Sequence, residues 1–347
     1  MHRIARISIP ILISACIATP AAAQQGPDTT WVPSIARPAY AGQSGPRVGI
    51  DQAHRNFHTA TGNYRPFAEL LRRDGYRVSA STQPFTRASL SAFDVLVIAN
   101  AAGGNNAETV SAPAFTADER TALREWVRRG GSLLLIADHA PYGAATEALS
   151  MEFGVGMSKG WTRDTTAGRS VGGNPSFLRF TRANGLLGRH QIMEGRGAGE
   201  RISAVQSFTG QSLGIPAGAA VLLQLSPTAE DRLPPTPAEL RELAAQQQRL
   251  IDSLAAAARA GGARDTTVRA VQVRPVAERY TSAAGRAQGV ALRFGAGRVV
   301  VLGEAAMLSA QRIVLPGRDP IRMGMNVPGS DDQQFALNVM HWLSRLF

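Results

Sequence analysis

The sequence predicts an α/β protein: a doubly wound, mainly parallel sheet flanked by helices, in one domain with insertions. Residues 94–99 (DVLVIA) and 132–137 (SLLLIA) are apolar without a break, as in strands that are buried on both faces. The stretch between them predicts a helix, because Thr116 and Glu119 form a capping box and Gly130 and Gly131 end the pattern. Strand, helix and strand in this order predict right-handed crossovers and parallel strands.

The first 23 residues fit a secretory signal peptide. Arg3 and Arg6 form a basic start, residues 7–18 are apolar but too short to cross a bilayer, and residues 21–23 (AAA) fit a cleavage site. We therefore expect export to the periplasm or beyond, with a mature chain that begins near Gln24. Residues 13–16 (ISAC) also fit a lipoprotein processing box, so a lipid anchor at Cys16 stays open.

Composition excludes several kinds of chemistry. Cys16 is the single cysteine, so cleavage after residue 23 leaves no thiol for a disulfide, a metal or a nucleophile. No second apolar run reaches the length of a membrane span. The net charge is +11, but the arginines come singly or in pairs, without interleaved aromatic residues. We therefore expect a solvated surface, no membrane span and no nucleic-acid partner.

The remaining elements follow from local signals. Residues 24–46 are rich in Pro, Gly, Ser and Thr and predict an extended leader before a single domain over 47–347. Strands are predicted at 48–50, 76–79, 202–208, 220–225, 290–294 and 298–302, and helices at 64–74 and after Ser330. Residues 154–200 predict a Gly-rich excursion over one edge of the sheet. The helix predicted at about 237–260 is mostly polar and Ala-rich, so we expect it outside the core.

Polar residues gather where the predicted strands end. Asp51, His54 and His58 follow the first strand, Asp138 and His139 follow residues 132–137, and Glu304 follows residues 298–302. Open α/β sheets place their chemistry at the carboxyl ends of the strands. We therefore expect Asp51, His54, His58 and His139 to converge on one site, with Asp138 and Glu304 close by.

Three interpretations of this site stay open. Imidazoles and carboxylates bind Zn²⁺ or Mn²⁺, and a metal-bound water is a nucleophile for which Asp138 or Glu304 serves as catalytic base. The same residues also suit a metal-free polar site. The structural alternative is that the histidines bond only to loop backbone. Further candidates for ligand contact are Asn56, Asn100, His190 and Asn326.

Two other signals have mainly structural interpretations. Residues 210–214 (GQSLG) match the nucleophile-elbow pattern of serine hydrolases, but Pro216 and Gly218 break the helix that this pattern needs, so a turn is expected. His341 lies opposite the apolar stripe of the last helix, and we expect it to be solvated.

The order of these motifs resembles a known superfamily. A His-containing loop after the first strand, then DVLVIAN, VRRGGSLLLIADH and GRVVVLGEAAML before a last helix, is similar to class I glutamine amidotransferase-like proteins. The resemblance covers residues 47–148 and 289–347, and is to non-amidotransferase branches: ThuA-like proteins and exported bacterial domains similar to the soluble part of GldG-type proteins. It implies a flavodoxin-like fold.

The resemblance also bears on activity. The superfamily's defining enzymes carry a cysteine at the turn where this chain has Asp138, His139 and Ala140, which argues against glutamine hydrolysis. ThuA-like proteins place a histidine at a position similar to His139. Two functions therefore stay open: a metal-assisted hydrolase of a small or glycan-like substrate, and a non-catalytic ligand-binding or scaffold domain.

Overall fold

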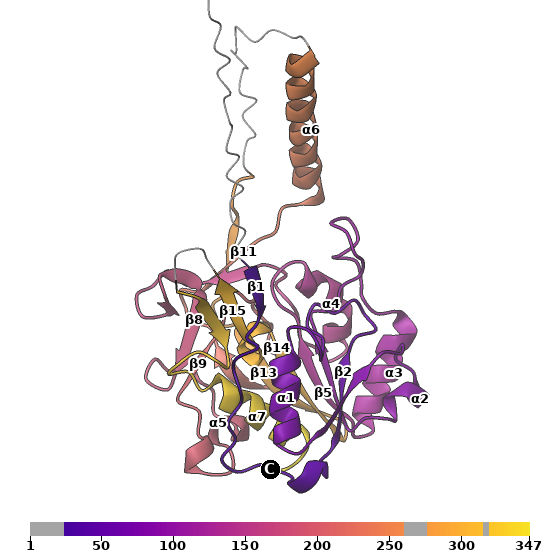
Figure 1. Cartoon of the computed structure of the whole chain (residues 1–347), viewed down its shortest axis with the longest axis vertical. Helices are drawn as coiled ribbons and strands as arrows, with labels where there is room; N and C mark the ends of the chain where they lie inside the picture. The colour runs from indigo at the N-terminus through magenta and orange to yellow at the C-terminus, as the bar shows by residue number, and fades with distance from the viewer. Residues whose placement is uncertain (1–23, 260–275, 315–318) are drawn as a thin grey trace, which may run out of the picture.

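A computed structural model describes residues 24–259, 276–314 and 319–347. Its centre is a seven-stranded sheet in the order β10-β13-β14-β5-β4-β2-β3 (Figure 1). These strands are β2 (Arg47–Asp51), β3 (Arg77–Ser81), β4 (Val95–Ala99), β5 (Ser132–Ile136), β10 (Ala220–Gln224), β13 (Ala287–Phe294) and β14 (Gly297–Leu302). The five strands from β14 to β3 are parallel, whereas β13 and β10 extend the sheet in antiparallel pairs. The predicted α/β sheet is confirmed.

Helices cover both faces of this sheet. On one face lie α1 (Arg65–Arg73) and α7 (Asp332–Leu343), whose Phe67 and Phe335 are fully buried in one hydrophobic core with residues of β4 and β14. On the other lie α2 (Arg87–Leu90), α3 (Ala117–Arg128) and α4 (Tyr142–Met151) (Figure 1). Strand side chains alternate between two separate hydrophobic cores: Val97 belongs to the first and Leu96 to the second. This alternation explains why the strands are apolar without a break.

The chain changes direction at β2. From β2 it crosses through α1 to β3 at the edge, then returns through α2 to β4 on the other side of β2. The carboxyl ends of β2 and β4 therefore flank the topological switch point, where open α/β sheets bind ligands. Below, "the rim" means the carboxyl edge of β2, β4, β5 and β14 with the loops that follow it.

Three small sheets surround the main one. The first joins β1 (Gln24–Pro27), β15 (Ala310–Val314) and β16 (Ile321–Gly324), so the start of the predicted leader is an edge strand. The second joins β12 (Tyr280–Ser282), β11 (Glu230–Arg232) and β6 (Trp161–Arg163). The third joins β7 (Ser170–Val171), β8 (Asn174–Thr181) and β9 (Ala204–Gln206). The Gly-rich excursion thus carries β6, β7 and β8, as well as α5 (Gln191–Glu194).

Helix α6 (Pro237–Arg259) stands away from the body (Figure 1). It lies between β11 and β12 in the sequence, and none of its residues 237–253, whose side chains are described, belongs to a hydrophobic core. The last residue of the helix predicted at about 237–260, Ala260, lies outside the described residues. In the described ranges no helix is both long and apolar enough to cross a membrane. The predicted signal peptide also lies outside them.

Candidate functional site at the rim

His54 is held between two carboxylates. Its Nδ1 lies 2.9 Å from Asp51 Oδ2, and its Nε2 lies 2.9 Å from Glu119 Oε1 at the start of α3. The ring packs against Phe85 and Phe115, with centroids 4.5 and 4.6 Å away. Burial alone lowers the pKa of His54, but the hydrogen bonds and charges of Asp51 and Glu119 outweigh it and raise that pKa. Both ring nitrogens are therefore occupied.

His58 belongs to a different network on the opposite face. Asn100, which follows β4, donates from Nδ2 to His58 Nδ1 at 3.1 Å, and its Oδ1 accepts the Asp138 backbone N–H at 2.8 Å. An amide nitrogen only donates, so Nδ1 must be unprotonated and the neutral ring carries its hydrogen on Nε2. Burial lowers the pKa of His58 to about 3, which keeps the ring neutral. Its Nε2 has no partner in the described chain although the residue is only 3% exposed.

Asp138 and Glu304 form a coupled pair of acids where β5 and β14 end. Burial raises the pKa of Asp138 to about 7. Burial and the charge of Asp138 raise the pKa of Glu304 well above its usual range. Glu304 is fully buried and accepts the backbone N–H groups of Ala306 and Met307 at 2.7 and 2.8 Å. Asp138 is 9% exposed, so it is the less buried of the two acids.

Aromatic side chains surround this position. Phe57 is 54% exposed and lies 6.1 Å from the ring of half-buried Tyr142. His139 stacks on Trp161 of β6 at 5.6 Å, and its Nδ1 donates to the Ala140 carbonyl at 2.7 Å. Burial lowers the pKa of His139, so this ring is neutral at neutral pH. The rim thus presents aromatic rings beside a carboxyl group that titrates near neutrality.

The four predicted metal ligands are not gathered into one shell. His54 packs into the core on the α3 side with Asp51, whereas His58 packs against Tyr64 in the core on the α1 side, at 4.6 Å. The described parts of the chain contain no group of three or more His, Cys, Asp or Glu side chains that could hold a metal ion. The expected convergence of Asp51, His54, His58 and His139 is therefore wrong, because the two loop histidines point to opposite faces of the sheet.

Several other candidates have structural partners. Asn56 accepts the His54 backbone N–H and donates to the Ala99 carbonyl, and Asn100 bridges His58 and Asp138. Asn326 donates to Asp28 and so fastens the leader. His190 caps α5 and packs against Trp342 of α7, beside Arg298 at the amino end of β14, so it is not at the rim.

His341 is fully buried and bonds Asp74 at 2.6 Å. It was expected to be solvated, and the expectation fails because other segments cover that face of α7: Asn338, on the same side of the helix, donates to the carbonyls of Ile192 and Glu200. The 210–214 segment is not the turn that was expected: Leu213 forms isolated β-bridges with Met157 and Ala287, and the turn comes later, at residues 217–218. Ser212 is fully buried and bonds Asp231 at 2.5 Å.

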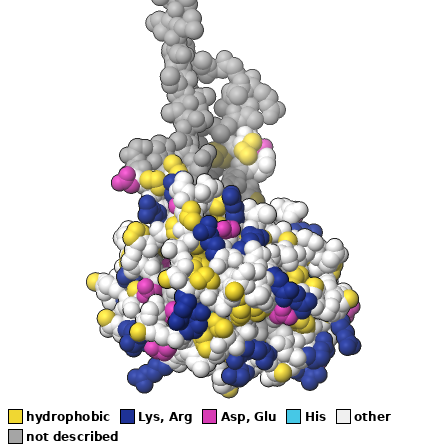
Figure 2. Space-filling view, turned by 60° about the horizontal axis from the view of Figure 1, so that its bottom comes forward, with side chains coloured by type: hydrophobic (Ala, Val, Ile, Leu, Met, Phe, Trp, Pro, Cys, Tyr) yellow, Lys and Arg dark blue, Asp and Glu magenta, His cyan; other side chains and the backbone are white. Residues whose placement is uncertain are grey.

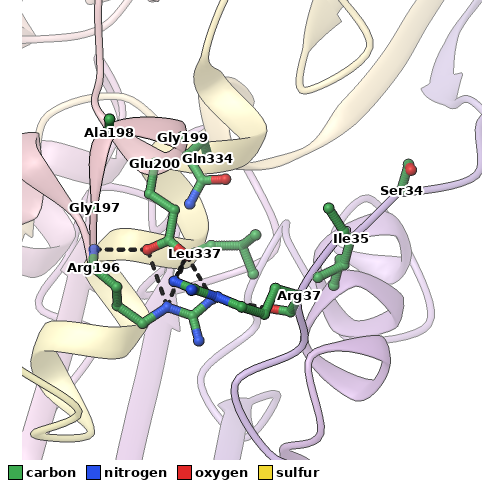
Figure 3. A pocket seen from close by; sticks show the side chains of 11 residues that line it. Ser34, Ile35, Arg37, Arg196, Gly197, Ala198, Gly199, Glu200, Gln334 and Leu337 are labelled. Atoms are coloured by element: carbon green, nitrogen blue, oxygen red, sulfur yellow. Dashed lines mark hydrogen bonds and ion pairs between the residues drawn. The ribbon is translucent and has the colours of Figure 1, made fainter.

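A groove of about 410 Å³ lies away from the rim, between the leader and the loop before β9 (Figure 3). Arg196 Nη2 lies 2.6 Å from Glu200 Oε1 and also donates to the Arg37 carbonyl, while the Arg37 guanidinium lies 3.4 Å from the same carboxylate. These contacts tie the leader to the body. On the face shown in Figure 2, Lys and Arg side chains are interleaved with uncharged ones and form no continuous stripe.

Comparisons with known proteins bear on the fold alone. No protein-family model matches the chain, and no curated protein matches it in sequence. Among solved structures, the N-terminal domain of mmIFT52 is 12% identical and aligns with a TM-score of 0.53 over 86% of this chain and 97% of its own. Two ThuA-like proteins also align. The one from Parabacteroides merdae is 10% identical, with a TM-score of 0.41 over 86% of this chain and 90% of its own.

The second ThuA-like protein, from Bacteroides uniformis, is 11% identical and has a TM-score of 0.38 over 90% of this chain and 94% of its own. At 12% identity and a TM-score of 0.53, the alignment with mmIFT52 shows a similar arrangement of sheet and helices and nothing of chemistry.

Three residues of the site were not singled out from the sequence. Glu119 was assigned to the capping box of α3. Its hydrogen bond to His54 joins residues 65 positions apart in the chain, and no local sequence pattern indicates that contact. Tyr64 begins the helix predicted at 64–74, and nothing in the sequence indicates that its hydroxyl donates to the Ala305 carbonyl at 2.9 Å, next to Glu304. Trp161 lies in the Gly-rich excursion, where its pairing in β6 could not be anticipated.

Proposed function

We propose that the protein is exported and binds a small, polar, glycan-like ligand at the rim, where Asp138 exchanges a proton with it. The observation that carries this proposal is a carboxyl group with a pKa of about 7 at the carboxyl edge of the sheet, beside aromatic side chains. Pockets for small ligands combine apolar rings with a few polar groups that fix orientation. Sugars suit such a surface because their C–H faces pack on rings and their hydroxyls bond carboxyl groups.

The neutral acid favours hydroxyl groups over cations. A protonated Asp138 donates one hydrogen bond and accepts others, so it can bond a hydroxyl group in either sense. The His58 Nε2–H adds a buried donor without a partner in the described chain, which a ligand or a water molecule can satisfy. Asn100 sets the position of both groups, since one side chain bonds each of them.

Hydrolysis is the second candidate, and the pKa of Asp138 favours it. A general acid works best when its pKa lies near the working pH, and burial has moved Asp138 there. The metal-assisted form would need Zn²⁺ or Mn²⁺ on His139 and its neighbours. His54 is not available for that role, because its two nitrogens already contact carboxylates.

The test begins with binding. Melting temperatures of the chain from Gln24 onward are measured with a panel of mono- and oligosaccharides, at pH 5.5 and pH 8.5. A sugar that stabilises the wild type but not Asp138→Asn supports the proposal, and Glu230→Gln, on β11, is the matched control. Chromogenic glycosides, esters, phosphates and amides, with and without Zn²⁺ or Mn²⁺, then separate a hydrolase from a binder. Stabilisation that survives Asp138→Asn unchanged would remove Asp138 from the site.

Export has its own test. Cell fractionation and N-terminal sequencing show whether the mature chain begins near Gln24 or at a lipidated Cys16. A cytoplasmic, uncleaved chain would contradict this part of the proposal without touching the ligand site.

A further inference from the structure

Behind the rim lies a cluster of fully buried polar side chains from four parts of the fold. Glu304 follows β14, Gln288 belongs to β13, Asp332 begins α7, and Ser207 follows β9, and each is 0% exposed. Such groups are normally hydrogen-bonded. Three of their atoms have no partner in the described chain: Gln288 Nε2 and Oε1 and Ser207 Oγ. Asp332 Oδ2 makes no hydrogen bond of good geometry, although the Ser330 hydroxyl lies beside this carboxyl group.

The backbone between Gln206 and Phe208 brings the two acids together. The Gln206 N–H donates to Asp332 Oδ1 at 2.9 Å, and the Phe208 N–H donates to Glu304. In an extended chain, amides two residues apart point to the same side and are separated by roughly 6.6 Å. The intervening Ser207 N–H points the other way, to the Leu178 carbonyl. Asp332 and Glu304 therefore lie side by side along one edge of this segment.

Gln288 lies against the same acid. A β-carbon built on Gly210 would fall 2.6 Å from Gln288 Nε2 and 2.7 Å from the Glu304 β-carbon, so both side chains pack closely against this glycine. The Gln288 amide therefore leaves a buried donor and a buried acceptor without partners next to a carboxyl group. Empty internal cavities are apolar, whereas polar ones hold water that makes about three hydrogen bonds.

We propose that Glu304, Gln288, Ser207 and Asp332 enclose ordered water, and that this water joins the carboxyl groups of Glu304 and Asp332 into one proton-sharing unit behind the rim. When the rim draws a proton from Glu304, the Asp332 proton moves through the water to Glu304. Asp332 is left ionised until it regains a proton from solvent. Glu304 and Asp332 are positioning residues, since neither touches a ligand.

Several titratable groups lie next to Glu304 and Asp332. Glu304 faces Asp138 from β5 and Tyr64 from α1, and Asp332 faces Glu304 and its own neighbour Asp331. Burial raises the pKa of Asp332 to about 8, and burial with the charge of Asp138 raises that of Glu304 well above its usual range, so folding favours the protonated form of both acids. The inference rests on the proposed function in one respect, that Asp138 links the rim to Glu304.

The hydration is tested without any ligand, so its failure and that of the proposed function are distinguishable. Gln288→Met keeps the volume but removes the amide. If the space is dry, losing an unpartnered amide should raise the melting temperature; if water bridges it, the melting temperature should fall. A rise would overturn the proposal. A high-resolution crystal structure of the wild type gives the same answer directly, because it shows either water oxygens among these four side chains or none.

Proton sharing is tested by infrared spectroscopy of the carboxyl C=O band over a pH titration. Glu304→Gln identifies the Glu304 component. Asp332→Asn should shift its midpoint, because the partner that shares the proton is gone. Asp331→Asn is the matched control: Asp331 also accepts N–H groups near β9, from Ser203 and Ala204, but lies outside the cluster. A Glu304 midpoint that is the same in wild type, Asp332→Asn and Asp331→Asn would show that the acids titrate independently.

Discussion

Replacing His54 should destabilise the protein strongly, because two carboxylates would lose the cation between them. Asp51 is fully buried and Glu119 is 9% exposed. Removing one partner of a buried ion pair typically costs about 3–5 kcal/mol, since the remaining charge stays buried without compensation. We expect His54→Ala to lower the free energy of unfolding by about that amount. The ring also packs against Phe85 and Phe115, and removing it leaves a space there that destabilises the fold further.

The pH dependence separates the charge from the packing. The folded state raises the pKa of His54 above its unfolded value of about 6.5. The contribution of His54 to the free energy of unfolding is therefore complete below that pH and is lost as pH rises through the folded pKa. For Glu119, the bonds from His54 and Thr116 outweigh burial and lower its pKa to about 2. Its contribution is present above its unfolded pKa of about 4.3 and is lost as pH falls toward 2.

The difference between wild type and His54→Ala should therefore be largest between about pH 4.5 and 6.5 and should shrink at higher pH. Denaturant unfolding across pH 4–9 measures it. The buried acids Asp138 and Asp332 also titrate in this range, but they are present in both proteins and cancel. His190→Ala is the control, because His190 caps a short helix and packs against Trp342, and loss of the cap should cost about 1 kcal/mol. A difference in unfolding free energy that is constant with pH, or that grows as pH rises, would refute the role of protonated His54 between the Asp51 and Glu119 carboxylates.

The same networks of side chains lead to four further predictions. Wild type should lose stability as pH rises from about 4 through 7, because folding disfavours ionised Asp138, and Asp138→Asn should lose less; melting temperatures at pH 5 and 8 compare them. Asn100→Ala should cost about 1–3 kcal/mol, since it removes the partner of His58 Nδ1 and of the Asp138 N–H, which denaturant unfolding will report. Any Zn²⁺ or Mn²⁺ found by elemental analysis of untagged protein should fall in His139→Ala and persist in His54→Ala. Purified mature protein should release no ammonia from glutamine and should be unaffected by thiol-alkylating reagents, because it has no cysteine; measurable ammonia release would contradict this prediction.

The fold could be predicted because its signals are local. Unbroken apolar strands such as residues 94–99, the capping box at Thr116 and the glycines before β5 each specify one element, and crossover handedness then orders the sheet. The same logic placed Asp138 and Glu304 at the rim, since every parallel strand ends there. Elements with weak local signals, such as α4 and the short strands of the excursion, were not predicted.

The side-chain partners could not be predicted for the same reason. His54 and His58 are four apart, which would place them together on a helix, but the segment is a loop in which Arg55 takes a positive φ of 51°. That residue turns the chain, and the two rings enter different cores. The contact between His54 and Glu119 depends on how α3 packs against the sheet. The sequence around neither residue predicts it.

The insertion that carries α6 closes on itself. β11 and β12 pair with Arg232 opposite Tyr280, and the Leu233 N–H donates to the Arg279 carbonyl at 2.8 Å, so the chain leaves and re-enters the body at one point. To the rest of the protein, residues 233–279 are equivalent to the turn of a hairpin. Doubling the length of such a loop costs only about 0.6 kcal/mol in closure entropy. The segment 233–279 can therefore be lengthened, shortened or replaced while β6, which carries Trp161, keeps its pairing register with β11.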